Sequence, residues 1–251
     1  MKKLAIAILL LAASVASSQA ASNWSGCYAG GNIGYSLGRA KTDTTFPNPT
    51  TTYSSANNLI GAVGGGQIGC NWLTSPAWLA GLEADIQWSG EDGSFQSNNP
   101  FFLVVTPGVT NFVGTNTVDA TSKITWLGTA RGRFGYLWND MLMFATGGLA
   151  YGEVKLSGTA TTAGSFCTPT PVCGAPLSQS VAIGGSNVNV GWTVGGGFEA
   201  VLPFPSWTWK VEYLYVDLGK LNATNAVGLV TGTKFTDNIV RLGLNYHFVT
   251  Y

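Results

Sequence analysis

The stretch Asp237–Phe248, near the end of the chain, alternates strictly between apolar residues and polar or small ones. Its apolar positions are Val240, Leu242, Leu244, Tyr246 and Phe248, and the positions between them are Arg241, Gly243, Asn245 and His247. A strand places successive side chains on opposite faces, so this stretch predicts a strand with one apolar and one charged face. The apolar face must pack against a protein core or against lipid.

Eight segments of this kind follow one another. They cover about Gly26–Gly38, Asn58–Asn71, Ala77–Trp88, Ala120–Trp138, Met141–Leu156, Asn187–Leu202, Trp207–Asp217 and Phe235–Phe248. Tight turns are expected at Asn71–Pro76, Asn139-Asp140 and Pro203–Ser206, and long loops at Arg39–Asn57, Ser89–Asp119, Ser157–Ser186 and Leu218–Lys234. Outer-membrane barrels alternate short periplasmic turns with long extracellular loops. We therefore predict an all-β, eight-stranded antiparallel up-and-down transmembrane barrel, with a lipocalin-like soluble barrel as the alternative.

The composition favours the membrane alternative. Charged residues make up 10% of the chain, against about 25% in a typical soluble domain. A soluble surface of this size needs more charge than that. The outer surface is therefore expected to meet something other than water.

Trp and Tyr recur at or near both ends of the apolar faces, where an aromatic girdle lies at the membrane–water interface. The girdle is predicted to contain Trp78, Trp88, Trp126, Trp138, Trp192, Trp207, Trp209, Tyr213, Tyr215, Tyr246 and Phe248. On the fourth segment, alternation puts Ile124 on this lipid face and Lys123 opposite it. Arg or Lys at mid-bilayer costs about 2–4 kcal/mol, so the charged faces are expected to line the lumen.

The predicted lumen face carries charges of both signs: Glu83, Asp85, Arg131, Arg133, Glu199, Lys210, Glu212 and Arg241. Counting from the short-turn ends places Glu83 level with Arg133, and Asp85 level with Arg131. The lumen of an eight-stranded barrel is just wide enough for its side chains to fill. We expect these charges to pair across neighbouring strands and plug the lumen. The alternative is a charged constriction that selects solutes in an open pore.

The first twenty residues have the pattern of a secretory signal peptide. Lys2 and Lys3 precede an apolar run from Leu4 to Ala13, and small residues at Ser18 and Ala20 suit a cleavage site. We predict a signal peptide over 1–20 and a barrel domain over 21–251. No later stretch is apolar for long enough to form a transmembrane helix.

Four cysteines in an exported chain suggest two disulfides. Cys167 and Cys173 are six residues apart in one predicted loop, which suits a local bridge. Cys27 and Cys70 lie on adjacent predicted strands, at similar distances from the centre of their hairpin, so a cross-strand bridge is a second candidate. With no CxxC motif and one histidine, neither a metal nor a cofactor is expected.

An enzyme of the hydrolase kind needs a base close to a nucleophile and an orienting carboxylate. The single histidine, His247, is expected to face the lumen at the periplasmic end of the last strand, where a hydrogen-bonding role suits it. The predicted loops contain no histidine. We therefore expect no catalytic residues and no enzymatic activity.

Several motifs together resemble the small outer-membrane immunogenic proteins of alphaproteobacteria, a porin-like family of surface antigens. The resemblance rests on Trp24–Tyr35, Gly65–Gly69, Gly81–Asp85, Gly132–Tyr136, Ala145–Gly152, Trp209–Gly219 and Asn238–Phe248, which touch nearly every predicted strand. It implies an OmpA-like eight-stranded barrel that is abundant, antigenic and braces the outer membrane; some relatives are described as haem-binding or porin-like. Such proteins usually stop at the terminal Phe, whereas Val249-Thr-Tyr251 follows here.

The leading hypothesis is a structural barrel and surface antigen of the Gram-negative outer membrane. The alternatives are a small-solute channel and a binder of haem or a host ligand, for which Tyr53 and the Phe101-Phe102 pair could stack a flat molecule. The expected partners are outer-membrane lipid, the barrel assembly machinery during insertion and extracellular ligands of the loops, with no nucleic acid. The sequence leaves open what the loops bind, whether the lumen conducts and whether barrels associate.

Overall fold

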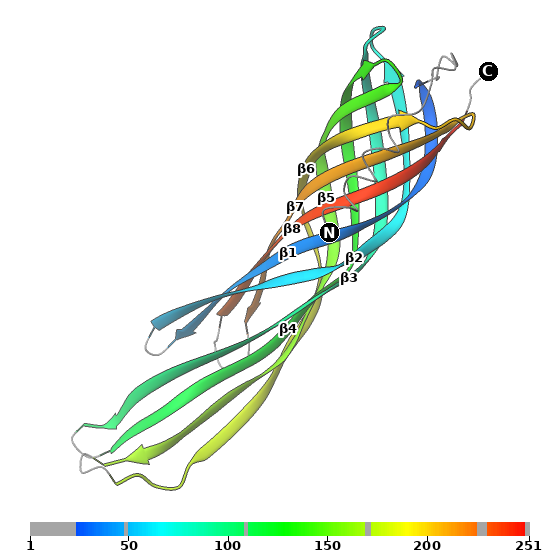
Figure 1. Cartoon of the computed structure of the whole chain (residues 1–251). Helices are drawn as coiled ribbons and strands as arrows, with labels where there is room; N and C mark the ends of the chain where they lie inside the picture. The colour runs from blue at the N-terminus through cyan, green and yellow to red at the C-terminus, as the bar shows by residue number, and fades with distance from the viewer. Residues whose placement is uncertain (1–23, 48–49, 108–109, 169–171, 225–229, 249–251) are drawn as a thin grey trace, which may run out of the picture.

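A computed structural model describes residues 24–47, 50–107, 110–168, 172–224 and 230–248. Eight antiparallel strands follow in chain order and close into one barrel, in which β8 pairs with β1 (Figure 1). The strands are β1 (Gly26–Pro47), β2 (Thr50–Leu73), β3 (Trp78–Thr106), β4 (Thr110–Trp138), β5 (Met141–Cys167), β6 (Leu177–Val201), β7 (Trp207–Thr224) and β8 (Val230–His247). The predicted signal peptide and residues 249–251 lie outside the described residues.

Three short turns connect the strands at one end of the barrel. Asn139 adopts a positive φ of 54° in the two-residue turn between β4 and β5. Asn tolerates this left-handed conformation, which two-residue hairpin turns require. Ser206, in the turn before β7, has a φ of 66°. Among the described residues, no helix is long and apolar enough to cross a membrane.

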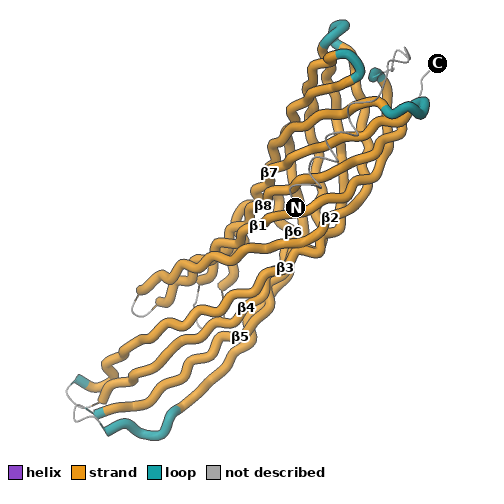
Figure 2. Tube along the Cα trace, in the orientation of Figure 1, coloured by secondary structure: helices purple, strands orange, loops and turns teal. Residues whose placement is uncertain are grey.

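The prediction of four long loops was wrong. Most of the described residues in these segments continue as strand, so that β3 and β4 pair from Trp78↔Tyr136 as far as Thr106↔Thr110. Thr and Val suit strands better than loops, and here they pair with one another across the hairpins. The strands therefore extend well beyond the closed barrel, as the tube in Figure 2 shows.

The extension is split because some strand pairs separate before others. β2 pairs with β3 only as far as Ile60↔Asp92, and β6 pairs with β7 only from Trp192↔Asp217 to Val201↔Thr208. Beyond these points β3, β4, β5 and β6 continue together as an open sheet, the longer arm at the lower left of Figure 1. Hereafter this sheet is called the four-stranded extension.

The extension should be dispensable for folding, because its residues pair with one another and not with the barrel wall. We expect a variant in which Asn-Gly turns replace residues 97–118 and residues 160–181 to keep the heat-dependent shift in gel mobility of a folded barrel. As a control, Leu82→Pro should abolish the compact band, since it removes a ladder hydrogen bond in the barrel wall. Loss of the compact band in the shortened variant would show that the extension is needed for folding.

Candidate functional site

The eight predicted lumen charges all project inward, and each is 5% exposed or less. Glu83 and Asp85 come from β3, Arg131 and Arg133 from β4, Glu199 from β6, Lys210 and Glu212 from β7, and Arg241 from β8. Four cations thus face four carboxylates. We call these eight side chains the charge layer.

Arg131 connects opposite walls of the barrel. Its guanidinium contacts Glu83 on the neighbouring strand, Asp85 at 2.8 Å and Glu212 across the lumen at 2.6 Å. Arg suits this position because its planar fork presents several N–H donors at once. One side chain therefore joins β4 to β3 and to β7.

Arg241 and Lys210 complete the centre of the charge layer. Arg241 donates from Nε to Glu212 Oε2 at 2.7 Å and from Nη2 to Asp85 Oδ2 at 2.9 Å. Lys210 Nζ donates to both oxygens of Glu83, at 2.8 and 2.7 Å. Every carboxylate of this central group therefore meets at least two cationic donors, which offsets the cost of burying it.

A second group of contacts lies nearer the short turns, around Glu199. This carboxylate pairs with Arg133 and accepts a hydrogen bond from Asn245 Nδ2 at 2.8 Å. His247 Nε2 lies 3.4 Å from Glu199 Oε1 and 3.1 Å from the Thr208 hydroxyl. The histidine is thus a lumen hydrogen-bonding residue, as the sequence predicted.

The structure adds lumen residues that the sequence analysis did not select. The Tyr28 hydroxyl donates to Glu83 Oε2 at 2.5 Å, and Gln67 Nε2 donates to Asn245 Oδ1 at 2.5 Å. A side-chain carbon at Gly69 would lie 2.5 Å from the Tyr28 ring, so a glycine is needed at this close approach. These positions could have been predicted, because each is an inward residue close to glycines of its strand.

Clusters of buried apolar side chains lie on both sides of the charge layer. Toward the extension, buried apolar side chains pack together: Ala40, Leu59, Val63, Ile124, Leu127, Ala150, Val154, Leu214, Val216, Leu218, Phe235 and Ile239. Toward the short turns, Trp24, Leu79, Leu142 and Phe144 form a smaller cluster. We call the first cluster the outer apolar layer and the second the inner apolar layer. The charge layer lies between them along the barrel axis.

Two details of the predicted lumen were wrong. Glu83 pairs with Arg131, and Arg133 pairs with Gly81, so the predicted register is off by two residues. A bulge between Ile124 and Trp126 also inverts the alternation on β4. Ile124 therefore faces the lumen, at 2% exposure, and Lys123 faces outward.

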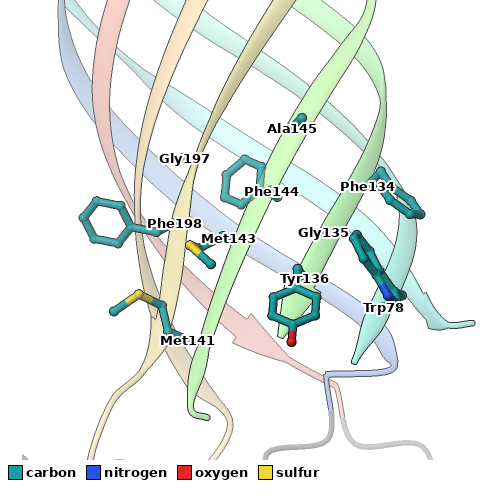
Figure 3. A pocket seen from close by; sticks show the side chains of 10 residues that line it. All are labelled: Trp78, Phe134, Gly135, Tyr136, Met141, Met143, Phe144, Ala145, Gly197 and Phe198. Carbon is teal, nitrogen blue, oxygen red and sulfur yellow. The ribbon is translucent and has the colours of Figure 1, made fainter. Parts of the chain in front are cut away.

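None of the eleven predicted girdle residues is buried. Trp207 packs edge-on against Tyr246 at the short-turn end, with ring centroids 5.3 Å apart, and Trp192 lies 5.4 Å from Tyr215 toward the extension. Near the short turns, a groove of about 550 Å³ is lined by Trp78, Phe134, Tyr136, Met141, Met143 and Phe198, together with Gly135, Phe144, Ala145 and Gly197 (Figure 3). This outer wall is shaped for apolar chains.

Both candidate disulfides are formed. Cys27 and Cys70 are directly opposite in the β1–β2 pair and bonded to each other, and Cys167 is bonded to Cys173 at the tip of the extension. The first bridge staples the barrel wall near the short turns, and the second closes a loop that links β5 to β6.

The chain matches a family model described as an outer membrane protein beta-barrel domain over residues 5–248. A 31 kDa outer-membrane immunogenic protein of Brucella melitensis is 32% identical over 237 residues, which cover 90% of this chain and 84% of the relative. A 22 kDa outer membrane protein of Rhizobium leguminosarum is 28% identical, over 91% of this chain and 80% of the relative. Among solved structures, the outer membrane protease OmpT of Escherichia coli aligns with 94% of this chain and 99% of its own, at 11% identity and a TM-score of 0.41.

Removing one cation from the charge layer should be costly, because it leaves buried carboxylates uncompensated. Arg131→Met is expected to lower the free energy of unfolding by about 3–5 kcal/mol. The measurement is urea unfolding in lipid vesicles followed by Trp fluorescence. The matched control is Lys155→Met, which removes a half-exposed outer-face cation paired with Glu153 at 3.4 Å and should leave the transition unchanged. Equal effects of the two substitutions would contradict the buried network.

Proposed function

Because this chain belongs to the outer membrane protein beta-barrel domain family and therefore resides in the outer membrane, we propose that it is a structural, non-conducting barrel. Its role is mechanical: the barrel braces the envelope, and its four-stranded extension is the surface antigen outside the cell. The observation that carries this proposal is the lumen, which is filled by a paired charge layer between two apolar layers. The immunogenic proteins named among its relatives are consistent with the antigenic part.

A closed lumen follows from the energetics of its layers. An ion crossing the barrel would have to displace charge-assisted hydrogen bonds, such as the 2.6 Å contact between Arg131 and Glu212, and then enter an apolar layer. Charge-assisted bonds of this kind are roughly twice as strong as neutral ones. An apolar constriction also resists wetting. The balanced charges of the charge layer and the apolar layer beside it together favour a plugged lumen over a pore that selects ions.

An enzymatic role has little support in this geometry. Thr208 is the hydroxyl beside His247, and both are buried in the lumen with the Glu199 carboxylate held by Arg133. A substrate would have to enter the lumen to reach these buried side chains. We therefore assign these residues to the packing of the lumen.

The proposed partners are those of an integral barrel. Outer-membrane lipid would pack its acyl chains against the outer wall, including the groove beside Trp78 and Phe198. The barrel assembly machinery would engage the chain during insertion, and export by a cleaved signal peptide over 1–20 would precede it.

The plug is tested by single-channel conductance of the refolded mature protein in planar bilayers. We expect the wild type to be silent and Arg131→Ser with Arg133→Ser to give brief openings, because water must then solvate unpaired carboxylates. Adding Leu214→Ser and Ile239→Ser should lengthen the openings by wetting the outer apolar layer. Frequent, stable steps in the wild type, or identical records from all three proteins, would contradict the plug.

A second candidate function is ligand binding by the extension, favoured by an uncharged aromatic cluster. Phe112 on β4 lies 5.7 Å from Phe101 on β3 and 4.9 Å from Phe166 on β5, measured between ring centroids. The chain carries no charged residue over 93–118 or 157–191. Such a surface suits a flat apolar molecule such as haem. The Tyr53 side chain, also considered for this role, lies outside the described residues.

This binding is tested by titrating haemin into the refolded protein and following its visible absorbance. Phe112→Ser should weaken binding roughly fivefold, since one aromatic contact is lost. Phe102→Ser, which alters the opposite face of β3, is the control and should bind as the wild type does. If haemin does not bind the wild type, or if both variants bind alike, the aromatic cluster is not a haem site.

A further inference from the structure

Two further carboxyl groups meet at the outer end of the lumen. Glu91 on β3 is 2% exposed and Asp237 on β8 is 1% exposed. A side-chain carbon at Gly38 on β1 would lie 2.9 Å from Glu91 Oε2 and 3.5 Å from Asp237 Oδ1. The absence of a side chain at Gly38 therefore lets the two carboxyls converge over β1.

The surroundings of this pair are apolar. Glu91 is paired across the ladder with Ile124, and Asp237 lies between Phe235 and Ile239 on the inner face of β8. Leu59 on β2 packs beside the pair, because its Cβ lies 3.3 Å from the position that a side-chain carbon at Gly38 would take. All four apolar side chains belong to the outer apolar layer. Two ionised carboxylates in this layer would be costly.

Hydroxyl groups satisfy only one oxygen of each carboxyl. Ser89 donates to Glu91 Oε1 at 2.9 Å, and Ser36 donates to Asp237 Oδ1. Glu91 Oε2 and Asp237 Oδ2 receive no hydrogen bond from any described residue. The two remaining oxygens therefore lack a donor, although both are buried.

No described cation balances the pair. On the strands around it, Arg39, Lys41, Lys123, Lys220 and Lys234 face outward, and Lys234 is engaged with Asp217 at 2.9 Å. The nearest inward cation on β8 is Arg241, whose donors go to Asp85, Glu212 and Gln87. The other inward-facing carboxylates close to the pair are Asp85 and Glu212. Both belong to the charge layer and are already paired there.

We propose that Glu91 and Asp237 form a proton-binding site in which one proton, shared between the two carboxyl groups, locks the outer end of the lumen. The shared proton supplies the missing donor and ties β3 to β8 across β1 and β2. Losing it places like charges in the outer apolar layer, which must then hydrate and loosen. This inference rests on the plugged lumen of the proposed function, since it names the condition that opens one of its layers.

The chemistry of the pair agrees with this geometry. Burial among apolar side chains and the facing carboxyl both favour the neutral, protonated form. A proton that is held more tightly in the folded state than in the unfolded chain contributes stability that is present at acidic pH and is lost as the pH rises.

The test combines two measurements on the full refolded barrel. Infrared spectra at pH 7 should show the carbonyl band of a protonated carboxylic acid, and Glu91→Gln and Asp237→Asn should each remove it. Between pH 5 and pH 8 the unfolding temperature of the wild type should fall by roughly 3 °C per pH unit relative to Glu91→Gln, because one bound proton is released. Asp92→Asn, at the exposed neighbouring position, should behave as the wild type does.

Three results separate the possible failures. A wild type without the carbonyl band, whose pH profile matches that of Glu91→Gln, overturns the proton site. Stabilisation by calcium at pH 8 in the wild type but not in Glu91→Gln also overturns it, in favour of a divalent cation. A barrel that conducts freely at pH 7 while retaining the band refutes the plug and leaves the proton site standing.

Discussion

Closing eight strands into a barrel leaves a lumen that side chains fill completely. Polar groups that point inward therefore find their protein partners mainly among the other inward side chains. Arg131 meets this requirement by reaching both Asp85 on the adjacent strand and Glu212 on the far wall. The cross-lumen contacts then fix the positions of strands that share no ladder. The narrowness of the lumen thus explains why its charged side chains pair across the barrel.

The outer wall is apolar, because its side chains pack against lipid and against each other. Trp78 stacks on Phe134 with ring centroids 5.1 Å apart. Farther along the outer face of β3, Leu82 and Ile86 are exposed between Trp78 and Trp88. Glu83 and Asp85 occupy the alternate positions of the same strand. A one-residue slip would put these carboxylates in lipid, so the register of the strand is strongly specified. The alternating pattern therefore fixes which face of the strand meets lipid and which face meets the lumen.

Strand number, order, turns and outer membrane location could be predicted from the sequence, because each rests on a local pattern. The register of β3 against β4 could not, since closing a barrel staggers its strands and counting from the turns ignores that stagger. Trp78 pairs with Tyr136, not with Trp138. The extension was missed because Thr- and Asn-rich segments were interpreted as loops. Their pairing partners, such as Thr161 opposite Thr117, are distant in sequence.

Two bulges explain the remaining errors at the site. Between Trp88 and Glu91 on β3, and between Ile124 and Trp126 on β4, an extra residue shifts the alternation. These irregularities oppose each other, since Trp88 pairs with Trp126 and Glu91 with Ile124. Together they rotate Ile124 inward to build the outer apolar layer and turn Glu91 into it. A bulge changes the inside–outside pattern, and Gly90 on β3 is a local signal for it that the strict alternation did not take into account.

The lumen thus contains two different solutions to the burial of carboxylates. In the charge layer each carboxylate is held by Arg or Lys, as in the pairs Arg131–Glu212 and Lys210–Glu83. At Glu91 and Asp237 the surroundings are apolar, and the compensating charge we infer is a proton, which the outside medium can remove. The two arrangements differ in what balances the carboxylates: side chains of the protein in the charge layer, and in the pair a proton that exchanges with the medium. Placing the responsive pair toward the extension would let the outer end of the lumen loosen while the charge layer still holds the barrel together.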